Sequence, residues 1–172
     1  MPDVFVKMHG LTYRRGTGVL VFRNGEYMPE LLVGQRANAC PPTWQTPQGG
    51  LEEGLSHEAN AYKEAKEELG LLPRELYFVG LTPTETMYTL PDDNRGRGFA
   101  GQVHRWAVMR YIGEPELPDL RLASDREFTS LRWAPPMWVI ANTSDFRVEP
   151  YRTAIPEAVE MVKALRRTPE QA

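Results

Sequence analysis

Short apolar runs bounded by turn residues predict strands in the first part of the chain. Residues 18–22 (GVLVF) form an apolar run that is typical of a buried strand. Asn24-Gly25 follows and favours a hairpin turn, so residues 30–34 (ELLVG) are the expected return strand. Residues 1–11 have no clear pattern, and we expect them to lie at the periphery as an arm or an extra strand.

Four more strands and two helices are predicted downstream. The strands cover residues 76–82, 85–90, 102–111 and 127–135, whereas residues 115–124 are loop-like. The second helix, at 151–167, carries an apolar stripe made by Ile155, Ala158, Val159, Val162 and Leu165. Mixed strands with two helices predict an α/β sandwich. The 172 residues contain no repeat, so we expect one domain, with residues 168–172 frayed.

The first helix, predicted over residues 56–70, carries the candidate chemistry. Ser56 is a good N-cap and Gly70 suits the end of a helix. Glu64, Glu67 and Glu68 fall within roughly 100° of its circumference, where their charges repel one another. A hard divalent cation such as Mg²⁺ or Mn²⁺ would remove that repulsion. The alternative is a solvated acidic face. The opposite side is predicted to pack on a core through Leu55, Ala59, Tyr62, Ala65 and Leu69.

The glycine-rich turn before this helix favours the metal-binding interpretation. With the helix it resembles a Nudix box, Gly-x5-Glu-x7-Arg-Glu-x-x-Glu-Glu-x-Gly, which here spans residues 49–71. The resemblance implies a Nudix-type α/β/α sandwich with a mixed central sheet. Two positions depart from the pattern: Leu55 replaces the first Glu and Lys63 replaces the Arg. The resemblance implies that the Glu and Arg usually found at these two positions form a structural salt bridge, which orients the loop and the helix. Because this chain replaces both, no single buried charge is left without its partner.

The segment Trp44-Gln45-Thr46-Pro47-Gln48-Gly49-Gly50 narrows the resemblance. It is similar to the WQxPQGG segment of the Nudix branch that contains diadenosine polyphosphate hydrolases and RNA 5′-pyrophosphohydrolases. This resemblance implies metal-assisted hydrolysis of a phosphoanhydride in a nucleoside polyphosphate or at an RNA 5′ end, with Mg²⁺ or Mn²⁺ as cofactor. The implied metal ligands are Glu64, Glu67, Glu68, Glu127 and a backbone carbonyl of the Gln48-Gly49 turn. Glu67, Glu68 and Glu127 all remain candidates for the general base.

The same resemblance implies a set of substrate-binding residues. Arg14 would contact phosphate, and Arg36 with Phe146 would sandwich a nucleobase. The full implied set is Arg14, Arg36, Gly49, Gly50, Phe146, Arg147 and Tyr151, and Arg95 and Arg97 add positive charge in a glycine-rich loop. Three of the implied site residues have a plainer alternative: Arg14 and Glu127 as surface residues, and Phe146 as a core residue.

Composition sets further bounds. The formal net charge of −3 gives no overall basic field for nucleic acid, although a local patch can still bind phosphates. One cysteine, Cys40, excludes an internal disulfide and fits a reducing compartment, so a cytoplasmic protein is expected. No stretch is long and apolar enough to span a membrane. The three histidines are too scattered to predict a zinc site, and the sequence does not indicate an oligomeric state or protein partner.

Three other functions compete with this interpretation. The first alternative is a Nudix hydrolase that acts on ADP-ribose or a nucleotide sugar. The second is a weakly active or inactive module that binds nucleotides or RNA. The third alternative is a structural domain with an accidental acidic helix. Retention of three mutually repelling carboxylates favours chemistry over binding alone, because a pure binder has less use for them.

Overall fold

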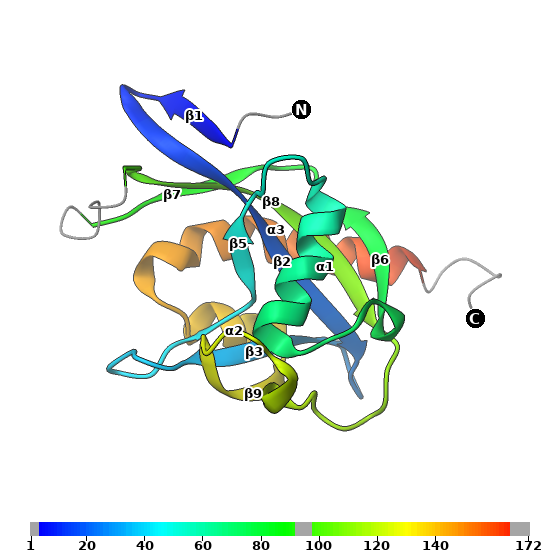
Figure 1. Ribbon diagram of the computed structural model, residues 1–172. Coiled ribbons are helices and arrows are strands. Elements are labelled where there is room, and N and C mark those ends of the chain that lie inside the picture. Colours follow the sequence, from blue (N-terminus) through cyan, green and yellow to red (C-terminus); the bar gives the residue numbers. More distant parts are fainter. Residues whose placement is uncertain (1–3, 92–97, 166–172) are drawn as a thin grey trace.

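Two parallel strands form the centre of the computed structural model, which describes residues 4–91 and 98–165. Strand β2 (Leu11–Asn24) lies beside β8 (Gly101–Tyr111), paired from Tyr13 and Gly101 to Phe22 and Arg110. Figure 1 shows them crossing the middle of the molecule, with helix α1 (His57–Leu69) in front of them. The strand predicted at 18–22 is therefore the inner part of a longer strand.

Antiparallel strands extend both sides of this pair and make the sheet mixed. The hairpin predicted at Asn24-Gly25 joins β2 to β3, and the Gly25 N–H donates to the Met28 carbonyl at 3.0 Å. Strand β2 also pairs with β1 (Phe5–Met8), β3 (Pro29–Arg36) and β5 (Gln48–Gly50). Strand β3 also pairs with β4 (Trp44–Gln45) and β9 (Phe128–Ala134). Partners of β8 are β6 (Leu76–Leu81) and β7 (Thr86–Thr89).

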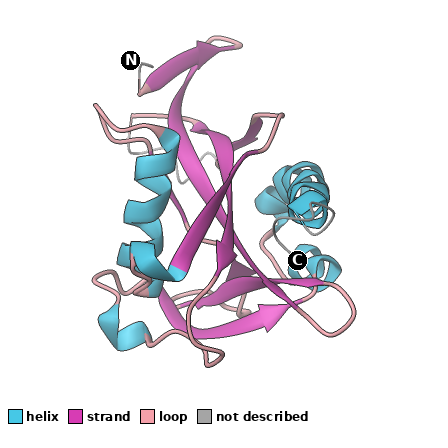
Figure 2. Ribbon diagram, turned by 90° about the vertical axis from the view of Figure 1, so that its right-hand side faces the viewer, coloured by secondary structure: helices cyan, strands magenta, loops and turns pink. Residues whose placement is uncertain are grey.

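Helices cover both faces of the sheet and create two separate cores (Figure 2). Val19 and Val21 of β2 belong to the first core, between the sheet and α1 (His57–Leu69). Leu20 and Phe22 belong to the second core, between the sheet and α3 (Asp145–Leu165). This two-sided burial explains the uninterrupted apolar run of β2, because successive side chains of a strand point to opposite faces. The α/β/α sandwich with a mixed central sheet is confirmed.

Helix α1 has the predicted ends, and its predicted core face is correct at Ala65 and Leu69, with Tyr62 packed against the core, but not at Ala59. The Ala59 N–H donates to the Ser56 side chain at 3.1 Å, and Gly70 ends the helix with φ of 71°, a left-handed conformation that favours glycine. Ala59 is exposed, so its predicted core position was wrong. The buried arc instead runs through Asn60, Ala61, Glu64, Ala65, Glu68 and Leu69. The acidic face thus adjoins the core, because the glycine turn covers it.

The C-terminal helices also differ from the prediction. Helix α3 begins at Asp145, before the predicted start at residue 151, and Pro150 and Pro156 lie inside it. A short helix, α2 (Pro136–Ala141), was not predicted, although proline is well suited to a first helical position. Two 3₁₀ turns, η1 (Pro73–Glu75) and η3 (Leu120–Leu122), occupy connecting segments. Within residues 4–91 and 98–165, no helix has the length and apolar character needed to cross a membrane.

Tyr151 of α3 connects this helix to the segment that leads into the glycine turn. Its ring is fully buried against Trp106, and its hydroxyl accepts a hydrogen bond from the Thr46 N–H at 3.0 Å. A buried N–H without a partner is costly, so this contact holds the WQTPQGG segment on the second core.

We predict that Tyr151→Phe lowers the free energy of unfolding by about 1–3 kcal/mol, because the buried Thr46 N–H loses its acceptor. Urea denaturation followed by circular dichroism measures the change. Tyr27→Phe, at a position 88 % exposed, is the matched control and should leave the midpoint unchanged. Equal midpoints for the two variants would contradict the assignment.

Candidate active site

The glycine turn of β5 lies directly against two carboxylates of α1. The Gln48 N–H donates to Glu68 Oε2 at 3.1 Å. A Cβ added to Gly49 would overlap the Glu64 carboxylate, and one added to Gly50 would overlap the Arg14 guanidinium. The two glycines leave room for these charged side chains against the backbone, and with a Cβ at either position the facing side chain would have to move.

Main-chain contacts with the sheet hold this turn in place. Strand β5 pairs with β2, where Gly49 lies opposite Thr17. The Val19 N–H donates to the Pro47 carbonyl at 2.9 Å, and the Leu51 N–H donates to the Arg15 carbonyl at 2.8 Å. Because β2 is the central strand, the turn is fixed to the most buried part of the fold.

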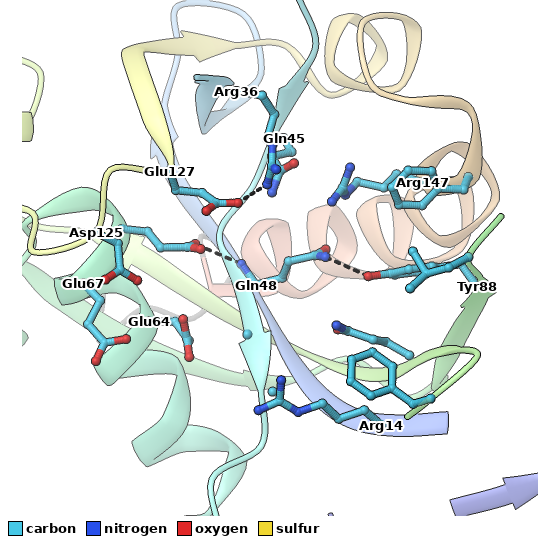
Figure 3. Close-up of a pocket in the computed structure, with 17 residues that line it drawn as sticks. Arg14, Arg36, Gln45, Gln48, Glu64, Glu67, Tyr88, Asp125, Glu127 and Arg147 are labelled. Atoms are coloured by element: carbon cyan, nitrogen blue, oxygen red, sulfur yellow. Dashed lines mark hydrogen bonds and ion pairs between the residues drawn. The ribbon is translucent and has the colours of Figure 1, made fainter. Parts of the chain in front are cut away.

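A pocket of about 710 Å³ opens over the turn. Figure 3 shows Glu64, Glu67 and Asp125 on one side of Gln48, with Arg36, Arg147 and Tyr88 on other sides and Arg14 below. The Gln48 side chain donates to the Tyr88 hydroxyl at 3.1 Å. The acidic side of the pocket comes largely from α1, and the basic and aromatic side comes from the sheet and α3.

Burial raises the pKa values of two carboxylates on the acidic side, Glu64 and Glu68. Burial raises the pKa of Glu68 well above that of an ordinary glutamate, and the nearby charges of Glu64 and Asp125 add to the rise. Burial also raises the pKa of Glu64, while Lys63 opposes the rise. The two side chains are only 5–6 % exposed. Their ionised forms are therefore unfavourable without a compensating cation.

Lys63 supplies part of that compensation from the rim. Its Nζ lies 3.1 Å from Glu67 Oε2, 3.5 Å from Glu64 Oε1 and 3.5 Å from Glu52 Oε2. Across the part of the chain that the structure describes, no group of three or more His, Cys, Asp or Glu side chains is already arranged to hold a metal ion. Two of the carboxylates, Glu64 and Glu67, are paired with Lys63 instead.

The donor set nevertheless fits a hard divalent cation. Every candidate ligand on this side presents a carboxylate or carbonyl oxygen, which Mg²⁺ and Mn²⁺ prefer. The acidic residues that line the pocket are Glu64, Glu67, Glu68, Asp125 and Glu127. A cation there would offset the burial of Glu64 and Glu68.

The basic side of the pocket contains paired and stacked groups. Arg36 Nη1 donates to Glu127 Oε1, so these two predicted site residues contact each other. The Arg147 guanidinium carbon lies 4.4 Å from the centroid of the half-buried Phe146 ring, which is 5.0 Å from the Tyr88 ring. Arg36, Phe146 and Arg147 all line the same pocket.

Most of the predicted site residues meet in this pocket. Its lining includes Arg14, Arg36, Gln48, Gly49, Gly50, Glu64, Glu67, Glu68, Glu127, Phe146 and Arg147. Tyr151 does not belong to it, because its ring is fully buried in the second core. Substrate contact by Tyr151 was therefore a wrong prediction, and the residue supports Thr46 instead. Arg95 and Arg97 lie outside the described residues.

Several lining residues were missed by the sequence interpretation. Asp125 reaches the acidic side because its N–H donates to the Glu67 carbonyl at 2.9 Å, a contact between distant segments. Gln45 is almost fully buried and faces the pocket from inside the WQTPQGG motif, which was the available signal. Among the residues described, Gln45 Oε1, Gln102 Oε1 and Arg147 Nε are buried without a hydrogen-bond partner. All three atoms belong to residues that line the pocket.

Comparison with known proteins places these features in a family. The sequence matches the family model of the NUDIX domain over residues 12–154. It is 31% identical over 161 residues to the RNA pyrophosphohydrolase of Rhodospirillum rubrum, covering 91% of this chain and 93% of that protein. It is 35% identical over 156 residues to the RNA pyrophosphohydrolase of Roseobacter denitrificans, covering 87% and 93%.

Solved structures share the fold at lower sequence identity. A C. elegans Ap4A hydrolase in a binary complex superposes with a TM-score of 0.60 and 17% identity, covering 81% of this chain and 93% of that one. The E. coli dihydroneopterin triphosphate pyrophosphohydrolase gives a TM-score of 0.66 and 19% identity, covering 85% and 94%. These likenesses establish the sandwich fold.

The raised pKa of Glu68 predicts a pH-dependent stability of the metal-free protein. The folded state binds the Glu68 proton more tightly than the unfolded chain does, so stability falls as pH rises from the ordinary glutamate range through the raised pKa. Glu68→Gln removes this loss. In EDTA the variant should melt several degrees above the wild type at pH 8, and the difference should shrink toward pH 5.

Thermal unfolding followed by circular dichroism across this pH range measures the effect. Glu58→Gln, at an exposed position on the same helix, controls for the loss of one negative charge. A Glu68→Gln variant that melts below the wild type at pH 8 would show that the buried carboxylate does not destabilise the fold.

Proposed function

The chain belongs to the Nudix domain family, and from this premise we propose that it hydrolyses a phosphoanhydride bond at the 5′ end of triphosphorylated RNA or in a dinucleoside polyphosphate. The observation that carries the proposal is the division of one pocket into a buried carboxylate side and an arginine–aromatic side. A nucleoside polyphosphate has matching parts: an anionic chain that needs cations, and a base that stacks on planar groups.

Relatives support this substrate class. The two bacterial proteins compared above are named RNA pyrophosphohydrolases, and the match covers 93% of each. The Ap4A hydrolase supports the fold alone, at 17% identity. RNA 5′ ends are therefore the favoured substrate, and dinucleoside polyphosphates are the second.

Glu64, Glu67 and Glu68 would hold Mg²⁺ or Mn²⁺, with Asp125 and Glu127 at the edge of the same pocket. Bound there, such cations supply charge neutralisation for the polyphosphate and activation of a water. One of Glu67, Glu68 and Glu127 accepts the proton of the attacking water as general base.

Arginines and rings position the substrate. The Arg14 guanidinium lies on Gly50, beside the acidic side, where its planar donors suit phosphate oxygens. Arg36 and Phe146 provide planar surfaces for a nucleobase, and Arg147 adds positive charge next to the ring. Cys40, an exposed free thiol, is consistent with the reducing cytoplasm as the compartment.

The first test compares hydrolysis of a short 5′-triphosphate RNA and of diadenosine tetraphosphate, with Mg²⁺ and with Mn²⁺. We expect metal-dependent cleavage, faster for the RNA. Glu68→Gln should reduce turnover by roughly 10²- to 10⁴-fold because it removes a ligand and candidate base. Release of products is measured by chromatography at saturating metal.

Glu58→Gln is the matched control, because it removes a carboxylate from the same helix at an exposed position. ADP-ribose and a nucleotide sugar complete the panel. Faster cleavage of either would assign the chain to that class of Nudix enzyme. Tight RNA binding without turnover of any substrate would instead indicate a binding module.

Metal binding should also stabilise the fold. Millimolar Mg²⁺ or Mn²⁺ is expected to raise the melting temperature, since binding at 100 times the dissociation constant adds about 2.7 kcal/mol. The rise should disappear in Glu64→Gln/Glu68→Gln. NaCl at equal ionic strength controls for screening, and an unmoved melting temperature with either divalent ion would contradict this metal site.

A further inference from the structure

We infer that Asn60 is a positioning residue, which holds the loop of residues 50–52 on α1 in a box whose usual Glu–Arg pair is absent. The inference rests on the proposed hydrolase activity for its kinetic consequence. Its structural basis is independent of that activity.

Asn60 bridges helix and loop with both ends of its side-chain amide. Its Nδ2 donates to the Gly50 carbonyl at 3.2 Å, and its Oδ1 accepts from the Glu52 N–H at 3.4 Å. The residue is fully buried on the interior face of α1. A buried amide is unfavourable unless its donor and acceptor are bonded, and here the loop backbone bonds both.

Asparagine at this position has no advantage for the helix itself. It is a weaker helix former than alanine, and its neighbour Ala61 packs in the apolar core without polar atoms. The favourable contribution of Asn60 therefore comes from its two bonds to the loop.

The bridged loop is continuous with the catalytic turn. Gly50 follows Gly49, which touches the Glu64 carboxylate, and Gln48 donates to Glu68. A shift of the loop would move these contacts relative to both carboxylates. Misplacement of about 1 Å is enough to cost on the order of 10²-fold in rate.

The charged contact between the same loop and helix is weaker. Lys63 lies 3.5 Å from Glu52, but the two side chains are 36% and 56% exposed, and exposed ion pairs contribute about 0–1 kcal/mol. Lys63 is also shared with Glu64 and Glu67. Leu55, half-buried, offers no charge to complete a pair. Asn60 therefore provides the buried, directional part of the connection.

A rescue experiment tests this role. Asn60→Ala is made in the native chain and in Leu55→Glu/Lys63→Arg, which restores the usual residues of the box. In the native chain we expect kcat at saturating metal to fall by roughly 10- to 100-fold, with a smaller change in KM. In the restored background the loss should be below about threefold, because a second connection holds the loop.

Asn142→Ala is the matched control. It removes an asparagine side chain that donates to the Trp138 carbonyl at 2.8 Å, away from the pocket, and should leave kcat unchanged in both backgrounds. An equal loss from Asn60→Ala in the two backgrounds would overturn the positioning role. Unchanged kcat with a lower melting temperature would show that Asn60 is structural only.

Amide hydrogen exchange makes the test independent of activity. The Glu52 amide donates directly to Asn60, so Asn60→Ala should speed its exchange, and that of Gln48, in the native background more than in the restored one. If the wild type hydrolyses none of the substrates, the proposed function fails, and these exchange rates still decide the role of Asn60. Equal exchange with and without the amide would reject it.

Discussion

The burial of two like-charged carboxylates beside a backbone turn is the constraint on which the rest of this structure depends. Glu64 and Glu68 are both buried, which raises the pKa of each, and the charge of Glu64 adds to the raised pKa of Glu68. That arrangement requires the turn to stay in place against the two carboxylates. The pairing of β5 with the central strand β2 holds the turn there. The capped ends of α1 and the hydroxyl of Tyr151 fix the same segments from two further directions.

The two sides of the pocket are built in different ways, and this separates chemistry from recognition. Most of the acidic side lies on one helix, so the relative positions of its carboxylates are set by helical geometry. The arginine–aromatic side gathers residues from β3, β7 and the start of α3. Substitutions on that side can alter which base or leaving group fits without moving the carboxylates, which is how one fold accommodates several substrates.

The sequence predicted the box well because its contacts are local and its signals are steric. Ser56, Gly70 and the glutamate spacing each have a physical meaning within a few residues, whereas Gly49 was identified through the family resemblance. Asp125 gave no such signal, because only the path of the loop before β9 brings it to Glu67. The side of α1 that faces the core was misjudged at Ala59, since periodicity does not show that a turn will cover the acidic face. Tyr151 was misplaced because its role was taken from the resemblance, and no local pattern shows that its ring is fully buried in the second core.

The parallel pairing of β2 with β8 has a consequence for the order in which the molecule assembles. Strand β2 is synthesised early, yet its central partner begins only at Gly101, after the whole box has been made. At a synthesis rate of about 5–20 residues per second, a nascent chain carries Glu64 and Glu68 for seconds before β8 exists. Pairing between such distant segments is slow because a long loop must close first. Glu64, Glu67 and Glu68 are thus made while the first core still lacks Ala107 and Met109. Asp125 and Glu127 follow β8, and the recognition side, which needs Phe146, is completed last.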